Sequence, residues 1–238
     1  LDHLPGKKIL YQGIRGQKDA LFSILPKDGR IACQYSPDGN VPTVSSMDAG
    51  LIDYLKTFDV QLVSSADLLQ HFGAVLTKAQ IDSHQRAGII IHRILDKTFQ
   101  WIRQSLDSQT PINEWMLLKK MQELIASEPI YMDSPPFFGI DEHACNPGYE
   151  PSPESSRPIQ EGSRLIIDIA GRLPEENAVY YDISWCMNIG PDIDPEYQRL
   201  FNTVNHARKL ALNYIRKQLD ENLPLRGCDV DALLRSYF

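Results

Sequence analysis

The chain has 238 residues and a formal net charge of −7, from 24 basic and 31 acidic side chains. This length fits one large domain or two small ones, and it is enough to bury a core. The acidic balance argues against a nucleic-acid groove, which needs a basic stripe, and no apolar run approaches the roughly 20 residues of a membrane span. The hydrophobic share of 42% is ordinary for a globular protein and excludes wholesale disorder or a fibre.

Residues 1–76 alternate short apolar runs with helical patterns. Strands are expected over 7–11, 30–35 and 60–63, helices over 17–25 and 48–58, and a turn over 36–40. Strands that alternate with helices favour an α/β layer with a parallel component. A domain boundary is predicted near residue 76, where a long helical pattern begins.

Four helices are expected after this boundary: one over 77–106, one that starts at Thr110-Pro111, one capped by Asp194-Pro195-Glu196, and one that begins near Asp229. The apolar stripe of the first consists of Ile81, Gly88, Ile91, Leu95, Phe99 and Ile102. On the same helix, His84 and His92 share a face only loosely, and we expect that face to be solvated. His206, which neighbours Arg208 and Lys209, is likewise expected on a polar helix face.

Between the second and third helices, the Pro-rich segment 131–162 is expected to be an ordered extended loop over the core. Two apolar segments, 164–170 and 178–187, follow it and have the composition of strands. The short polar segment 172–177 joins them, so a β-hairpin is predicted.

The four cysteines, Cys33, Cys145, Cys186 and Cys228, are widely spaced and form no CxxC or CxxH motif. Zinc-ribbon and redox-motif interpretations therefore fail. Scattered thiols of this kind fit a reducing compartment, where each is a small core residue, and we expect a cytoplasmic protein. The first residue is Leu1 rather than Met, which hints at a piece of a longer protein.

Asp168 and Asp182 are the most informative residues, because each stands alone inside an apolar strand. A buried carboxylate costs several kcal/mol unless it is paired, protonated or bound to a metal. Side chains alternate along a strand, so the two carboxylates of a hairpin can share one face, where a divalent cation can hold them together. The alternative is an Asp that caps a turn or meets a buried Arg, and the spacing alone does not decide between the two.

At these residues the sequence resembles a known family. Residues 165–170 and 180–184 resemble the paired-Asp signature of the pita-bread metallopeptidases, which include aminopeptidase P, prolidase and methionine aminopeptidase. Residues 146–151 resemble the loop that precedes the first metal-binding Asp, and 160–163 the polar turn into its strand. Residues 30–86 resemble the end of the creatinase-type N-terminal domain of Xaa-Pro peptidases.

The resemblance implies an α/β (α+β) fold: the end of a creatinase-like domain over 1–76, then the first half of a pita-bread domain over 77–238. It implies a hydrolase with two divalent metal ions (Mn, Co or Zn) that acts as an Xaa-Pro aminopeptidase or dipeptidase. Asp168 would chelate one metal and Asp182 would bridge both. The implied partners are a peptide substrate and a second copy in a homodimer, with neither nucleic acid nor membrane.

Two departures from the family pattern matter. The family has a His before the Tyr of its upstream loop, whereas this chain has Gly148 there and a histidine, His143, earlier in the loop. The family's other metal ligands, one His and two Glu, lie in the second half of the fold, beyond Phe238, so this chain alone is expected to be inactive. The alternatives are a peptide- or protein-binding relative that has lost metal ligands, which Gly148 would fit, and a structural or dimerising fragment.

Overall fold

The structure is a computed structural model that describes residues 5–39 and 41–238. The chain divides into two compact units, Leu1–Thr77 and Lys78–Phe238. The division falls beside the boundary that the sequence indicates near residue 76. That the first unit is the end of a creatinase-like domain stays a prediction.

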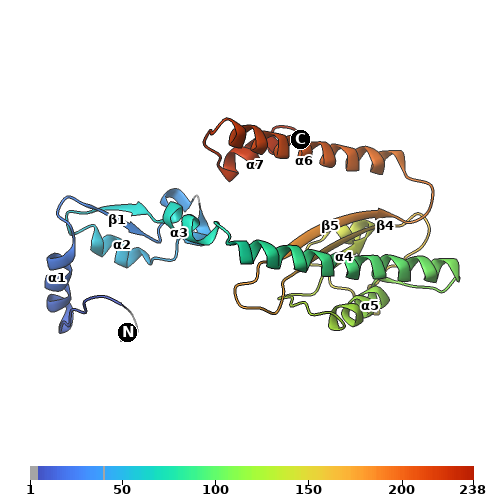
Figure 1. Cartoon of the computed structure of the whole chain (residues 1–238), viewed down its shortest axis with the longest axis horizontal. Coiled ribbons are helices and arrows are strands. Elements are labelled where there is room, and N and C mark those ends of the chain that lie inside the picture. The colour runs from blue at the N-terminus through green and yellow to red at the C-terminus, as the bar shows by residue number, and fades with distance from the viewer. Residues whose placement is uncertain (1–4, 40) are drawn as a thin grey trace. The chain divides into compact units, whose positions relative to one another are not determined.

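The first unit contains α1 (Gly13–Ile24), β1 (Arg30–Cys33), α2 (Ala49–Leu55), β2 (Gln61–Ser64) and α3 (Ala66–Gly73) (Figure 1). Strands β1 and β2 are paired in parallel, so the predicted parallel component is confirmed. Asp48 caps α2, because its carboxylate accepts a hydrogen bond from the Leu51 N–H at 2.9 Å. Of the predicted turn, Pro37–Gly39 form a 3₁₀ turn, and Asn40 lies outside the described residues.

One prediction for this unit is wrong, and one helix was missed. Residues 7–11 are not a strand, because they are exposed and pair with no strand in the described chain, and apolar composition alone does not make a strand. Helix α3 was not predicted, since its eight residues are too few for a clear helical period.

The second unit contains α4 (Lys78–Asp107), α5 (Glu114–Ala126), β3 (Phe137–Ile140), the 3₁₀ segment η3 (Asp141–Cys145), β4 (Arg164–Gly171), β5 (Tyr181–Asn188), α6 (Pro195–Asp220) and α7 (Gly227–Arg235). Its antiparallel sheet has the order β3-β4-β5, which confirms the β4–β5 hairpin. Strand β3 lies within the segment predicted as an extended loop. It directly follows Pro135-Pro136 and stands at an edge of this sheet, a position that tolerates nearby proline.

Helices α4 and α5 supply the core of this unit together with one face of the sheet. Strand β4 alternates between buried and half-buried residues, as a strand with one covered face must. The buried side chains include Ile91, Ile94, Leu95, Leu117, Met121, Phe138, Ile140, Leu165, Ile167 and Ile169. Ile81, the first residue of the predicted stripe, is exposed. The opposite face of the sheet therefore carries the polar residues of β4 and β5.

Helix α5 begins later than predicted. Asn113 is extended and caps the helix by accepting a hydrogen bond from the Met116 N–H at 3.0 Å. Residues 112 and 113 pair instead with the distant segment 158–159, through an isolated bridge between Asn113 and Pro158. A contact between segments so far apart in sequence overrides the local signal of Pro111.

The two histidines of α4 are not on a solvated face, contrary to the prediction. His84 donates from Nδ1 to the Tyr180 carbonyl at 2.7 Å, and His92 Nε2 is 2.9 Å from the Tyr181 hydroxyl. Gly88 lies between them, and a Cβ there would meet the Tyr181 ring at 2.8 Å. The ring of Tyr181 thus sits in a notch on α4.

The cysteines were also predicted wrongly as core residues. Cys33 is half-buried, and the other three are exposed, at η3, on the polar face of β5 and at the start of α7. All four are free thiols. Within the described residues, no helix combines the length and the apolar character needed to cross a bilayer.

Candidate metal centre and the loop beside it

Asp168 and Asp182 lie on adjacent antiparallel strands and face the same side of the sheet. Asp168 stands opposite Ser184, and Asp182 stands opposite Ala170. Directly opposed residues of an antiparallel pair share a face, and so do residues two apart on one strand. The two carboxylates are therefore diagonal neighbours, and the predicted shared face is confirmed.

The burial that the sequence suggested for these carboxylates is wrong. Asp168 is half-buried and Asp182 is exposed. The apolar residues that surround them in the sequence, such as Ile167 and Ile183, point to the other face, toward the helices. In this chain the two carboxylates thus remain in contact with solvent, where an ion can reach them.

One oxygen of the Asp168 carboxylate accepts a hydrogen bond within the hairpin. Ser184 lies across the hairpin and donates from its hydroxyl to Asp168 Oδ1 at 2.6 Å. A hydroxyl that holds one oxygen of a ligating carboxylate fixes its orientation, a common arrangement around protein-bound metals.

The donor set fits part of a site for divalent ions. Two carboxylates on one face supply the hard oxygen ligands that Mn²⁺ and similar ions accept. Among the residues that the structure describes, no group of three or more His, Cys, Asp and Glu side chains is arranged to hold a metal. Asp168 and Asp182 therefore account for a partial coordination shell.

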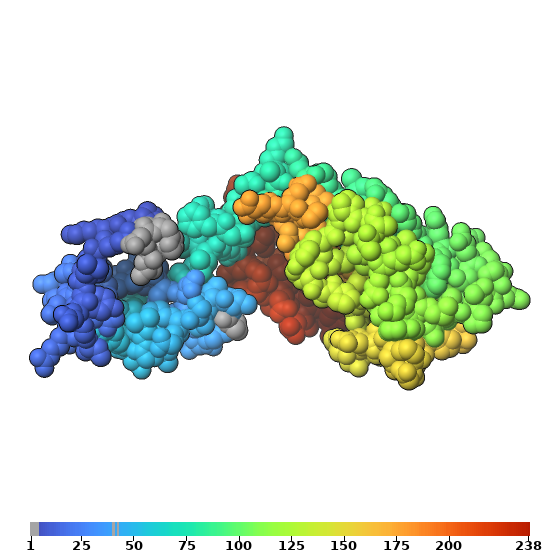
Figure 2. All heavy atoms as spheres, turned by 90° about the horizontal axis from the view of Figure 1, so that it is seen from below, coloured from blue at the N-terminus to red at the C-terminus, as the bar shows by residue number. Residues whose placement is uncertain are grey.

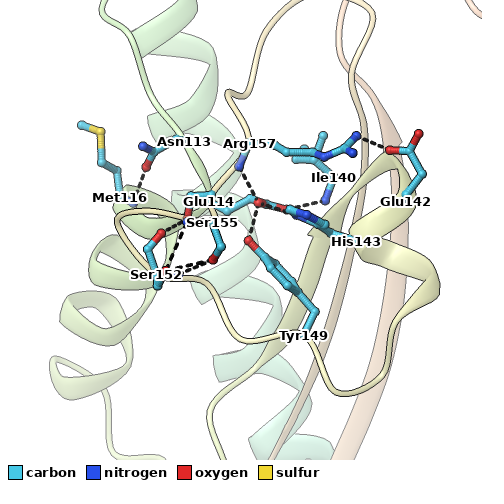
Figure 3. A network of polar contacts seen from close by, with 11 residues as sticks. Asn113, Glu114, Met116, Ile140, Glu142, His143, Tyr149, Ser152, Ser155 and Arg157 are labelled. Atoms are coloured by element: carbon cyan, nitrogen blue, oxygen red, sulfur yellow. Dashed lines mark hydrogen bonds and ion pairs between the residues drawn. The ribbon is translucent and has the colours of Figure 1, made fainter.

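Glu114 is a functional candidate that the sequence reasoning missed. Its side chain, in the first turn of α5, is 0% exposed, and four groups between Ile140, the last residue of β3, and Arg157 lie within hydrogen-bond distance of it. The donors are shown in Figure 3: the Ile140 N–H, His143 Nδ1, the Tyr149 hydroxyl and the Arg157 N–H. A Glu after an Asn cap is an ordinary helix start, so the sequence carried no signal of this burial.

His143 is held by this carboxylate. Its Nδ1 lies 2.8 Å from Glu114 Oε2, and its ring stacks on Tyr149 with 3.9 Å between centroids. Because a carboxylate only accepts hydrogen bonds, Nδ1 carries the proton. Burial and the hydrogen bond to Glu114 raise the pKa of Tyr149. His143 is thus bound to Glu114, and Gly148 occupies the position that holds a histidine in the family pattern.

Residues 82–238 match the model of Metallopeptidase family M24. The chain belongs to this family. No curated protein matches the chain.

Among solved structures, the chain is similar to a dipeptidase from Pyrococcus horikoshii, with TM-score 0.53 and 22% identity over 95% of this chain and 56% of that one. It is also similar to a prolidase from Thermococcus sibiricus, with TM-score 0.47 and 18% identity over 89% of this chain and 53% of that one. The chain thus spans about half the length of these two structures.

A third similar structure is an X-prolyl aminopeptidase from Caenorhabditis elegans, described as a cytosolic enzyme with a di-nuclear active site. Its TM-score is 0.47, with 16% identity over 57% of this chain and 22% of that one. The family match and the likeness to the dipeptidase confirm the pita-bread resemblance and the α/β class with mixed helix and sheet.

Proposed function

We propose that this chain carries the first metal ligands of a metal-dependent peptidase of the Xaa-Pro aminopeptidase or dipeptidase kind. The observation that supports the proposal is the pair Asp168 and Asp182 on one face of the β4–β5 hairpin, inside the segment that matches the metallopeptidase family.

In the proposed centre, Asp168 would chelate one divalent ion and Asp182 would bridge two, the roles that the resemblance implies, with Mn, Co or Zn as the candidate metals. Such ions supply an activated water and polarise the scissile carbonyl. Ser184 donates a hydrogen bond to Oδ1 of Asp168, which would hold this carboxylate in place for an ion. One His and two Glu, which the resemblance places in the second half of the fold, would complete the shell. The homodimer implied by the resemblance stays a prediction.

The test is metal counting by plasma emission on the full-length protein, where Asp168→Ala and Asp182→Ala are compared with the wild type. We expect Asp182→Ala to lose both ions, because it removes the bridge, and Asp168→Ala to keep the second ion more readily. Asp107→Ala is the control, since this carboxylate is 74% exposed at the end of α4. Unchanged stoichiometry in Asp182→Ala would refute the assignment.

A second candidate, a peptide-binding module without hydrolysis, is favoured by one observation. Gly148 stands where the family has a loop histidine, and the nearby His143 is engaged by Glu114. The two candidates separate on the full-length protein: release of free amino acids from an Xaa-Pro dipeptide supports the peptidase, whereas binding without release supports the module.

A further inference from the structure

The segment between β3 and β4 has little regular structure of its own. After η3, residues 146–163 form no helix and no strand in the described chain. In Figure 2 part of this segment (yellow) lies at the surface beside α5 (yellow-green). A long irregular segment keeps one conformation only where specific contacts offset its conformational entropy.

One carboxylate supplies such contacts at the start of the segment and again at Arg157, before the segment reaches β4. The Ile140 N–H, at the end of β3, donates to Glu114 Oε1 at 2.7 Å. The Arg157 N–H donates to Glu114 Oε2, also at 2.7 Å. Between these two residues, His143 and Tyr149 bind Oε2 at 2.8 and 2.6 Å (Figure 3). Glu114 therefore closes the segment into a loop, here named the 140–157 loop.

The arrangement uses both oxygens of the carboxylate as acceptors. Two backbone N–H groups and the Tyr149 hydroxyl donate to it, and a fully buried carboxylate is tolerated only when its oxygens are hydrogen-bonded. The two backbone donors, Ile140 and Arg157, bind different oxygens. In Glu114→Gln, whichever way the amide is turned, one of these two N–H groups faces an NH₂ group that cannot accept.

The loop also adjoins the candidate metal face. Strand β3 pairs with β4 so that Phe137 stands opposite Asp168, on the strand edge away from Ser184. Gly139 lies two residues from Phe137 and therefore on the same face as Asp168. A Cβ at Gly139 would lie 2.6 Å from backbone atoms of His143 and Ala144, so the start of the loop packs on this face. The conformation of the loop thus determines what lies at the edge of this face.

We propose that Glu114 is a positioning residue for peptide binding, which it serves by holding the 140–157 loop in one conformation beside Asp168. The anchoring stands on the contacts above, and its use in peptide binding rests on the proposed function.

The anchoring is tested by hydrogen exchange on this chain, with Glu114→Gln compared with the wild type. We expect the amides of 141–157 to exchange about 10- to 100-fold faster, as the loss of hydrogen bonds to a buried charge implies, while the β4–β5 amides keep their protection. Glu123→Gln, on the same helix and 70% exposed, is the matched control. Should Glu114→Gln fail to fold, Tyr149→Phe is measured instead, because it removes a single donor to Glu114. The anchoring then predicts a smaller increase in the exchange rate of the loop amides. Unchanged exchange in the loop would overturn the anchoring.

The peptide-binding role is tested on the full-length protein by calorimetric titration with an Xaa-Pro dipeptide. We expect Glu114→Gln to raise Kd about 10-fold with the metal stoichiometry unchanged, and Glu123→Gln to leave both at the wild-type values. Faster loop exchange with an unchanged Kd, or a wild type that binds no dipeptide, would overturn the positioning role. A wild type that binds the dipeptide without cleaving it refutes the proposed peptidase, and the Kd ratio then still decides for or against Glu114.

Discussion

A single methyl group added at Gly139 should destabilise the second unit strongly. A Cβ at this position would lie 2.6 Å from the Ala144 nitrogen and the His143 carbonyl carbon. These are backbone atoms of η3, so no side-chain rotation relieves the clash. To restore an ordinary separation, η3 must move by about 1 Å.

Such a movement pulls His143 away from Glu114 and Asp141 away from Arg164, whose Nε donates to it at 2.9 Å. Overpacking costs about 1–3 kcal/mol, and a weakened hydrogen bond to the buried charge costs about 1.5–3 kcal/mol. For a unit of this size the total lowers the Tm of Gly139→Ala by roughly 10 °C.

Thermal unfolding monitored by tryptophan fluorescence measures this change in Tm for the second unit, because all three tryptophans lie between Lys78 and Phe238. Gly148→Ala is the control, since a Cβ there meets only Asn146 Oδ1, at 3.6 Å. If Gly139→Ala unfolds at the wild-type temperature, the close approach of η3 to β3 does not exist and the reasoning is refuted.

Three further predictions concern the ion pairs of Glu128, the metal affinity of this chain and the role of Gly148. Hydrogen bonding to Lys97 and the charge of Arg93 lower the pKa of Glu128. The ionised Glu128 therefore stabilises the fold above the unfolded-state pKa of about 4.3, and this stabilisation is lost as the pH falls through the lower folded-state pKa. In urea unfolding, the difference in free energy of unfolding between the wild type and Glu128→Gln should vanish over this range of pH. Titration of this chain with Mn²⁺ should show weak binding at most, because two carboxylates leave most of a shell of about six ligands to water; tight two-site binding would contradict this. Gly148→His, whose Cβ would meet only Asn146 Oδ1 at 3.6 Å, should increase dipeptide cleavage by the full-length protein if this glycine limits activity, and unchanged rates would exclude that.

The sequence predicted the parts of the fold whose signals are long or repeated. The 30-residue helix α4 and the β4–β5 hairpin carry many periods of their pattern, so their existence did not depend on distant contacts. Strand β3 has only four residues, and four residues fit a strand, a turn or an extended loop equally well. The start of α5 was misplaced for a related reason, because the pairing of residue 113 with residue 158 is invisible to any local pattern.

In the candidate site too, the features that follow from local rules were predicted and those that depend on distant contacts were not. The shared face of Asp168 and Asp182 follows from the alternation of side chains within a hairpin, a local rule. Their exposure does not, because it depends on which face the helices cover. Glu114 was beyond prediction, since its four donors come from positions 26 to 43 residues away in sequence. A buried carboxylate is defined by such distant partners.

One face of the β4–β5 hairpin carries the two carboxylates, and the other face packs against the helices. The contacts on the helix face fix the position of Asp182. Tyr181 and Asp182 are neighbours on β5, so their side chains point to opposite faces. On the helix face, the Tyr181 ring fills the notch at Gly88, and its hydroxyl meets His92 at 2.9 Å. Since any side chain at residue 88 would push this ring outward, the glycine sets how closely β5 approaches α4. The backbone of Asp182 is thereby fixed from behind, and the open face stays free for ligands.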